Sequence, residues 1–335
     1  MEHRPVVFFE AEEWERSTIE RLTPPFQSRF VTAPLSVATA GEARDSMAVS
    51  VFIHSHINGE VLAALTDVGL IATRSTGFDH IDLPACKERG VAVANVPHYG
   101  ENTVAEHTFG LILTLSRNIH KAYLRTSSGD FTLEGLQGFD LKGKTLGVVG
   151  AGNIGLHVIQ IARGFGMEVL AYDVQQGPML AEVLGFRYVS LKELLSRSDI
   201  ITLHMAALPS THHLINRETL AFVKRGALLI NTARGSIVDT EALIWALDEG
   251  LLAGAGLDVL EGEEYLKEER QLLGAPQAQD TLRTLVTNHI LMHRPNVVIT
   301  PHIAFNSHEA LTRIVQTTIE NITAFLEGHS NNLVH

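Results

Sequence analysis

The stretch at residues 145–155 reads TLGVVGAGNIG, a short apolar run that leads into Gly150-x-Gly152-x-x-Gly155. Each glycine has a mechanical role in such a pattern. The first makes a tight turn, the second lets the backbone approach a pyrophosphate, and the third lets a helix pack closely on the strand. Apolar helix-forming sequence follows the third glycine. The stretch therefore predicts a strand, a turn and a helix that together bind a dinucleotide.

The sequence beyond the helix indicates which dinucleotide is bound. A second apolar run, Val169–Tyr172, ends in Asp173. A carboxylate at this place can accept hydrogen bonds from both ribose hydroxyls of an adenosine, and it repels a 2′-phosphate. Asn153 and Ile154 stand at the helix start, where free backbone N–H groups bind a pyrophosphate. These features favour NAD over NADP.

Composition is typical of a globular enzyme. The 335 residues are 45% hydrophobic and 19% charged, enough for two domains with their own cores. A formal net charge of −12 argues against nucleic acid or an anionic membrane as partner. The one cysteine, Cys86, cannot form an intrachain disulfide. The first residues, MEHRP, lack the features of a signal peptide, and no apolar run approaches a membrane span. We expect a cytoplasmic protein.

The first hundred residues alternate between short apolar strands and helices. The expected helices are Gly59–Thr66 and Leu83–Arg89, and the expected strands are Val6–Phe9, Val49–Ile53, Leu70–Thr73 and Val91–Ala94. Such alternation predicts a parallel sheet with helices on its faces, here a flavodoxin-like substrate domain. One long helix is expected from about Asn102 to Leu124.

A second alternating set follows, with the glycine-rich turn at its first crossover. Its expected helices span 154–165, 191–196, 217–223 and 239–249, and its expected strands span 145–149, 168–172, 199–203, 227–231, 253–257 and 297–300. This order predicts a doubly wound Rossmann sheet. Residues 264–292 are expected to form a surface excursion with one helix at 280–290.

The last expected helix, 307–327, has no strand after it and is expected to return to the first domain. The substrate domain then comprises residues 1–100 and 306–335, and the NAD-binding Rossmann domain comprises residues 101–305. The fold class is accordingly α/β, with two doubly wound parallel-sheet domains.

Three consecutive strands of the second set end in residues that carry chemistry. Strand 227–231 leads to Arg234, strand 253–257 to Asp258 and then Glu263, and strand 297–300 to His302. Parallel strands end at one edge of their sheet, where ligands bind. An arginine there can bind a carboxylate, and a histidine beside a carboxylate can exchange protons near neutral pH. The alternatives are a surface arginine in a turn and a structural histidine, one of 17 in the chain.

The ordered motifs of the chain resemble those of the D-isomer-specific 2-hydroxyacid dehydrogenases. The resemblance extends from about residue 45 to 325. The matching pieces are STGFDHID (75–82), NVPHY (95–99), VAEHT (104–108), GVVGAGNIG (147–155), NTARGSIVD (231–239), GLDVLE (256–261) and TPHIAF (300–305).

The resemblance implies roles for the residues at the strand ends. Arg234 would orient the substrate and activate its carbonyl, His302 would be the general acid/base, and Glu263, rather than Glu261 or Glu264, would be its carboxylate partner. The implied cofactor is NAD. The implied substrate is a small 2-ketoacid or 2-hydroxyacid, and the implied assembly is a homodimer through the cofactor domain.

Two aromatic residues favour a particular activity, the reversible reduction of pyruvate to D-lactate by NADH. The resemblance places Tyr99 and Phe305 around the substrate methyl group, and it places the backbone of Thr76 and Gly77 at the substrate carboxylate. The alternative for Tyr99 and Phe305 is ordinary core packing at the domain interface.

The resemblance also assigns residues to the cofactor side. They are His204, Ala206, Thr232, Ala233 and Asp258, and we expect Asp258 and the Ala233 carbonyl to fix the carboxamide. Ala206 departs from the family pattern, because relatives usually have proline there. The long excursion after Glu263 is a second departure, and it weakens the proton relay if it displaces that carboxylate.

Other functions remain open from the sequence. One is reduction of another 2-ketoacid, such as hydroxypyruvate, glyoxylate or a branched or aromatic ketoacid. Another is a dinucleotide-sensing protein like the corepressors that share this fold. No metal site is predicted. The pair His212-His213 would need a third ligand, and a solvated turn is the favoured interpretation of it.

Overall fold

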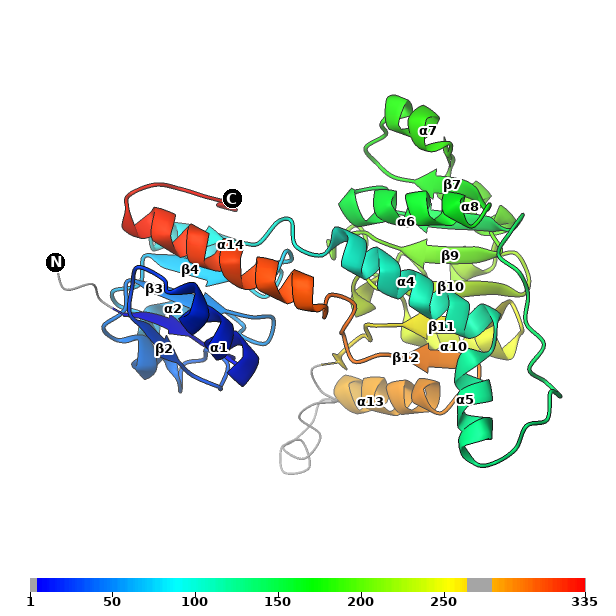
Figure 1. Cartoon of the computed structure of the whole chain (residues 1–335), viewed down its shortest axis with the longest axis horizontal. Coiled ribbons are helices and arrows are strands. Elements are labelled where there is room, and N and C mark those ends of the chain that lie inside the picture. The colour runs from blue at the N-terminus through cyan, green and yellow to red at the C-terminus, as the bar shows by residue number, and fades with distance from the viewer. Residues whose placement is uncertain (1–4, 264–278, 335) are drawn as a thin grey trace. The chain divides into compact units, whose positions relative to one another are not determined.

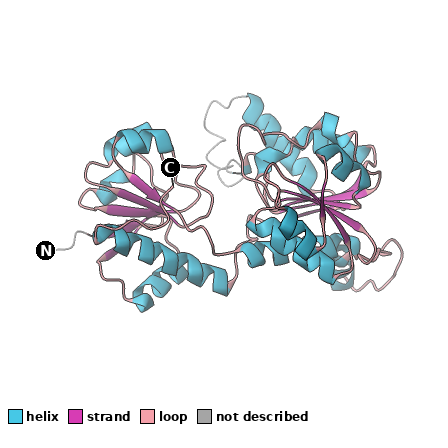
Figure 2. Cartoon of the chain, turned by 90° about the horizontal axis from the view of Figure 1, so that it is seen from above, coloured by secondary structure: helices cyan, strands magenta, loops and turns pink. Residues whose placement is uncertain are grey.

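The structure, a computed structural model, describes residues 5–263 and 279–334. The chain folds into two compact units, Met1–Tyr99 with Asn306–His335, and Gly100–Phe305. Each unit is a parallel sheet with helices on both of its faces (Figures 1 and 2). The predicted α/β fold class with two doubly wound domains is confirmed.

The first unit has five parallel strands in the order β2-β1-β3-β4-β5. This order is the flavodoxin-like one. The strands are β1 (Val6–Phe8), β2 (Ser28–Phe30), β3 (Ala48–Val51), β4 (Leu70–Thr73) and β5 (Ala92–Ala94). Its helices are α1 (Glu13–Leu22), the 3-10 helix η1 (Ala40–Ala43), α2 (Gly59–Ala64), α3 (Leu83–Glu88) and α14 (His308–Leu326).

Alternate residues of the first sheet enter two separate cores. Val7 and Val49 pack on the face that α2 and α3 cover, together with Cys86 of α3. Phe8 enters the core on the opposite face, which Ile322 of α14 shares. The last helix of the chain therefore completes the core beneath the first strand, and α14 contacts α1 and β4.

The second unit has seven parallel strands in the order β12-β11-β10-β9-β6-β7-β8. Its first six strands in chain order follow the Rossmann arrangement. The strands are β6 (Thr145–Val149), β7 (Glu168–Tyr172), β8 (Arg187–Tyr188), β9 (Ile200–Leu203), β10 (Ala227–Asn231), β11 (Leu252–Leu257) and β12 (Val297–Ile299).

The helices of the second unit cover both faces of its sheet (Figure 2). They are α4 (Glu101–Ser116), α5 (Ile119–Ser127), α6 (Asn153–Gly164), α7 (Pro178–Leu184), α8 (Leu191–Arg197), α9 (Arg217–Leu220), the 3-10 helix η2 (Gly235–Ile237), α10 (Thr240–Asp248) and α13 (Gln279–Met292). No helix among the described residues is long and apolar enough to cross a bilayer.

The expectation of one helix over 102–124 is wrong, because the chain breaks there into α4 and α5. Asn118 has a left-handed backbone with φ 51°, a conformation that asparagine tolerates better than most residues. Its Nδ2 donates to the carbonyl of Gln137, 3.1 Å away. This contact with a distant loop holds the break in place.

The other expected elements of the second unit lie within a few residues of those observed. The sequence interpretation missed six elements: α1, η1 and β2 in the first unit, and α7, β8 and η2 in the second. Most of the expected excursion, residues 264–278, lies outside the described residues, and α13 stands where a helix at 280–290 was expected.

Candidate active site

Three neighbouring strands end at one edge of the second sheet. β11 pairs in parallel with β10 on one side and with β12 on the other. The residues that follow these strands, Arg234, Asp258 and His302, therefore start from the same edge. Local hydrogen bonds hold each of them in place.

Asn231, the last residue of β10, shapes the turn that carries Arg234. Its Oδ1 accepts the backbone N–H of Ala233 at 3.0 Å, and its Nδ2 donates to the carbonyl of Arg234 at 2.9 Å. Nη1 of Arg234 donates to the Ala233 carbonyl, 2.9 Å away. The neighbouring Thr232 shares a 3.0 Å hydrogen bond with Thr108 of α4. The guanidinium is thus carried on a turn fixed from two sides.

Gly235 brings this turn against the segment that follows β11. A Cβ on Gly235 would lie 2.1 Å from the backbone carbon of Leu260. Only glycine permits such an approach, because any side chain would collide with the Leu260 backbone. Arg234 is therefore held next to the segment that leads to Glu263.

Asp258 organises the loop of His302. Its side chain is 1% exposed, and its two oxygens accept the backbone N–H groups of Ile303 at 2.9 Å and Ala304 at 2.8 Å. Its carbonyl accepts the N–H of His302 at 2.8 Å. His302 has a left-handed backbone with φ 55°, which the surrounding structure must enforce in a non-glycine residue. Asp258 provides that restraint.

Two further residues support the loop that carries His302. Thr300 donates its hydroxyl to Oδ1 of Asp258, and Nε2 of His107 lies 3.0 Å from the same hydroxyl. His107 Nε2 also lies 3.5 Å from Asp258 Oδ1. The sequence interpretation gave neither residue a role. Their position inside two of the quoted motifs, VAEHT and TPHIAF, was the available signal.

Glu263 is the carboxylate that meets His302. Its Oε1 lies 2.6 Å from Nδ1 of the imidazole, and both side chains are partly buried. Its Oε2 accepts the backbone N–H of Leu260 at 3.3 Å, which fixes the carboxylate. Glu261 points elsewhere and binds His213, and Glu264 lies outside the described residues. Carboxylate and imidazole together can hold and transfer a proton.

The glycine-rich turn has the shape that a dinucleotide pyrophosphate requires. Gly150 has φ 96°, and a Cβ there would lie 2.7 Å from the carbonyl of His204. A Cβ on Gly155 would lie 2.1 Å from the Gly150 carbonyl. Gly152 faces open space and caps α6 without a side-chain hydrogen bond to the helix N–H groups. Backbone donors at the start of α6, at Asn153 and Ile154, suit an anion there.

Asp173 follows β7 and joins that strand to the glycine-rich turn. Its Oδ2 accepts the N–H of Ala151 at 2.7 Å, and its Oδ1 accepts the N–H of Gln175 at 2.8 Å. A carboxylate oxygen can accept two hydrogen bonds, so both oxygens retain capacity for ribose hydroxyls. Turn, helix start and carboxylate together fit a dinucleotide.

His204 lies after β9, beside the same turn. Burial lowers the pKa of its imidazole to about 3, so the ring is neutral at physiological pH. Its Nε2 lies 2.8 Å from the hydroxyl of Thr202, whereas its Nδ1 is buried with no hydrogen-bond partner among the described residues. Ala206 lies further along the same loop and is exposed, and its carbonyl accepts the Thr211 hydroxyl at 2.7 Å.

The remaining predicted substrate residues are divided between the units. Phe305 ends the second unit, whereas Thr76, Gly77 and Tyr99 belong to the first. The Ser75 hydroxyl donates to the Gly77 carbonyl at 2.6 Å, and the Thr76 hydroxyl donates to the carbonyl of Val96 at 2.8 Å. Tyr99 is partly buried, and its carbonyl accepts Nε of Arg313 at 2.7 Å.

A buried arginine that the sequence interpretation missed supports the Thr76–Gly77 turn. Arg74 is 1% exposed and its Nε lies 2.7 Å from Oε1 of Glu15. Its other nitrogens donate to the hydroxyl of Ser50 and the carbonyl of Phe9. Because the guanidinium is fully paired in the core, it anchors the strand end and does not face a ligand.

Comparison with known proteins gives consistent matches over most of the chain. Residues 109–304 match the family model described as "D-isomer specific 2-hydroxyacid dehydrogenase, NAD binding domain". The chain is 40% identical to D-lactate dehydrogenase of Escherichia coli K12 over 313 residues, which are 92% of this chain and 93% of that protein. It is also 40% identical to an aromatic 2-oxoacid reductase of Clostridium sporogenes over 301 residues, 89% of this chain and 88% of that one.

A solved structure is also similar over nearly its full length. D-lactate dehydrogenase from Aquifex aeolicus, complexed with NAD and lactic acid, matches with a TM-score of 0.86 and 36% identity, and the match covers 96% of each chain.

Proposed function

Because this chain belongs to the D-isomer-specific 2-hydroxyacid dehydrogenases and binds NAD, we propose that it reduces pyruvate reversibly to D-lactate with NADH. The observation that carries this proposal is the 2.6 Å contact between His302 Nδ1 and Glu263 Oε1, on the same sheet edge as Arg234. An acid/base pair beside an arginine is what reduction of a 2-ketoacid requires, because the carbonyl oxygen gains a proton and the carboxylate needs a counter-charge.

His302 is the general acid of this reaction. Because Glu263 occupies Nδ1, the ring presents Nε2 to the substrate and transfers a proton from it to the carbonyl oxygen. The contact with Glu263 also fixes the orientation of the imidazole ring. Asp258 supports the same step indirectly, because it accepts hydrogen bonds from the backbone N–H groups of Ile303 and Ala304 and so holds the loop that carries His302.

Arg234 binds and activates the substrate. Its planar guanidinium holds the substrate carboxylate and polarises the carbonyl, which prepares the keto carbon for reduction. Bound NADH supplies the hydride to that carbon. We assign the pyrophosphate to the N–H groups of Asn153 and Ile154, the adenosine ribose to Asp173, and the carboxamide to Asp258 and the Ala233 carbonyl. His204, Ala206 and Thr232 complete the cofactor side.

The preference for pyruvate over other 2-ketoacids depends on the residues around the substrate. We assign the backbone N–H groups of Thr76 and Gly77 to the substrate carboxylate, and Tyr99 and Phe305 to a small apolar pocket for the methyl group. Relatives named D-lactate dehydrogenase support this assignment. The equally similar aromatic 2-oxoacid reductase makes a larger 2-ketoacid the main alternative.

We propose that the protein is cytoplasmic, in accordance with its single cysteine, and that it forms the homodimer that the family resemblance implies. A dinucleotide-sensing protein without turnover is the alternative from another class. The first experiment is therefore a spectrophotometric assay of NADH oxidation with pyruvate and the purified chain. Turnover with pyruvate supports the proposal, whereas NADH binding without turnover of any 2-ketoacid supports the sensing alternative.

A further inference from the structure

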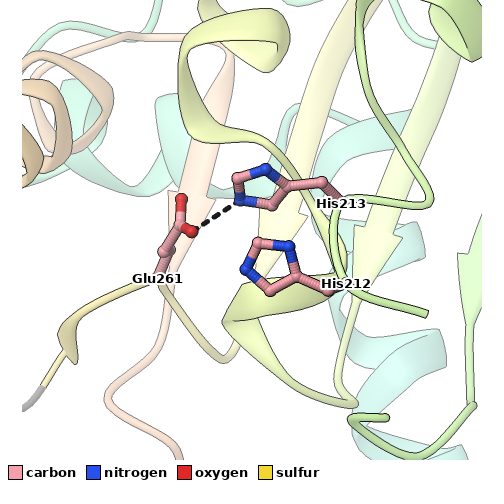
Figure 3. Close-up of side chains that lie close together, drawn as sticks. All are labelled: His212, His213 and Glu261. Atoms are coloured by element: carbon pink, nitrogen blue, oxygen red, sulfur yellow. Dashed lines mark hydrogen bonds and ion pairs between the residues drawn. The ribbon is translucent and has the colours of Figure 1, made fainter. Parts of the chain in front are cut away.

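A cluster of three metal-ligating side chains lies on the second unit, apart from the His302–Glu263 pair. Its members are His212, His213 and Glu261, and one ligand atom from each lies within 4.8 Å of the others (Figure 3). The histidines come from the loop after β9, and the glutamate comes from the segment after β11. Folding thus brings together ligands that stand 48 residues apart in sequence.

The two imidazole rings are stacked on one another. Their centroids are 4.0 Å apart with an interplanar angle of 29°. Nε2 of His213 lies 2.6 Å from Oε1 of Glu261, and one nitrogen of His212 lies on the side of its ring that faces the same carboxylate (Figure 3). Two nitrogens and one oxygen therefore converge on one small volume.

Surrounding hydrogen bonds fix two of the three ligands. The backbone of His213, with φ 48°, is held at its N–H by the Ser236 carbonyl at 2.9 Å and at its carbonyl by Nδ2 of Asn216 at 3.0 Å. Oε2 of Glu261 accepts the hydroxyl of Thr240 at 3.1 Å. Such outer contacts orient the ligands of metal sites and raise their affinity.

We propose that His212, His213 and Glu261 bind one divalent transition-metal ion, with Zn²⁺ as the reference ion. Two imidazoles and one carboxylate form a donor set that suits Zn²⁺ and its neighbours, whereas Mg²⁺ and Ca²⁺ prefer oxygen alone. Three protein ligands leave a fourth tetrahedral position for water. This inference goes beyond the dehydrogenase activity and does not depend on it.

The geometry requires only small movements to accept an ion. Tetrahedral bonds of about 2.0–2.1 Å separate neighbouring ligand atoms by about 3.4 Å. The His213–Glu261 contact of 2.6 Å opens slightly to that value, and the His212 ring moves inward. His212 is exposed, so its ring has room to move from its stacked position toward the ion. His213 and Glu261 already stand in their supported positions.

An ion in this place stabilises the folded chain, because it links two segments that are separate in the unfolded chain. Any ligand that binds only the native state raises the free energy of unfolding by RT ln(1 + [L]/Kd), and the unfolding temperature rises with it. Glu261 stands two residues before Glu263, so the ion also ties down the segment that carries the proposed carboxylate partner of His302. The bound ion would therefore have a structural role, because it stabilises the position of that segment.

The test uses the full chain after treatment with a chelator. Binding of Zn²⁺ is measured by calorimetric titration, and the unfolding temperature is then compared with and without Zn²⁺. We expect one ion per chain and a rise in unfolding temperature. His212→Ala removes one ligand from an exposed position, and the affinity should fall at least about tenfold. His213→Asn is the second variant, because asparagine tolerates the left-handed backbone, and it should weaken binding similarly.

His289 and His293 provide a matched control. Their rings are also stacked, with centroids 6.4 Å apart, but no carboxylate joins them in a three-ligand group among the described residues. His289→Ala should bind Zn²⁺ as tightly as the native chain. The proposal is overturned if the native protein binds no ion at micromolar Zn²⁺ in excess over the protein. It is also overturned if His289→Ala loses the ion while His212→Ala keeps it.

Discussion

Nδ1 of His302 lies 2.6 Å from Oε1 of Glu263, whereas Glu261, two residues earlier, makes an equally short contact with His213. The two carboxylates of one short segment thus serve two different imidazoles. This division explains why only one of them is a candidate for proton transfer. It also separates the proposed catalytic pair from the proposed metal site.

His302→Ala should lose most of kcat, because general acid catalysis contributes about 10²–10⁴-fold. NADH binding, measured by fluorescence titration, should change little. His302→Asn is the control for the loop, since asparagine tolerates the left-handed backbone at φ 55°. Both variants should lose kcat alike, and a variant with native kcat would mean that another residue supplies the proton.

Glu263→Gln should lower kcat of pyruvate reduction. Glutamine retains the size and can still accept a hydrogen bond from Nδ1 of His302, but it is no longer a carboxylate that can hold and transfer a proton together with the imidazole. The measurement is kcat and KM for pyruvate at one pH. Glu261→Gln, assayed without added metal, is the matched control and should retain the native kcat. A loss of kcat in the control alone would assign the proton relay to Glu261.

Asp173→Asn should narrow the preference for NADH over NADPH. Asparagine can still accept the N–H of Ala151, which the native carboxylate accepts at 2.7 Å, but it no longer repels a 2′-phosphate. Asp173→Ala should lose NADH affinity as well, because the acceptor is removed. The ratio of kcat/KM for the two cofactors measures the effect. An unchanged ratio in both variants would contradict the ribose assignment.

The free energy of unfolding should fall as the pH drops below about 6.5, the usual pKa of histidine in an unfolded chain. Burial lowers the pKa of His204 to about 3 in the folded chain, so the unfolded state binds the extra proton between these values. The stabilisation is complete above about pH 6.5 and is lost progressively toward pH 3.

His204→Gln tests this contribution, because glutamine can replace Nε2 as partner of the Thr202 hydroxyl without titrating. Denaturant unfolding from pH 4.5 to 7.5, without NAD, should show a shallower pH dependence in the variant than in the native chain. Equal pH dependence would mean that His204 does not titrate on unfolding.

The sequence was sufficient to predict every strand of the two sheets except the edge strands β2 and β8, because buried parallel strands are apolar runs and the turn after β6 needs its three glycines. It did not predict the break at Asn118. That break depends on a hydrogen bond to Gln137, which local helix propensity cannot reveal. The two-residue strand β8 is too short to produce a detectable pattern.

The candidate site was predictable as far as strand ends could indicate it. Arg234 follows β10 and His302 follows β12, the two strands that flank β11, so their common sheet edge could be inferred from the order of the elements. The support of the His302 loop by Asp258 could not, because it spans more than 40 residues of chain. The same holds for the third residue beside His212-His213, since Glu261 approaches only through the fold.

The measurement that tests the central claim most directly is kcat/KM across pyruvate, 2-ketobutyrate, 2-ketoisocaproate, phenylpyruvate, glyoxylate and hydroxypyruvate, with chiral analysis of the product. A roomy pocket gains about 0.8 kcal/mol for each added methylene, whereas a tight one loses affinity by overpacking. We predict that pyruvate has the highest value, that the product is D-lactate, and that Phe305→Ala shifts the preference toward larger ketoacids. A tenfold advantage for any other ketoacid, or L-lactate as the product, would contradict the proposal.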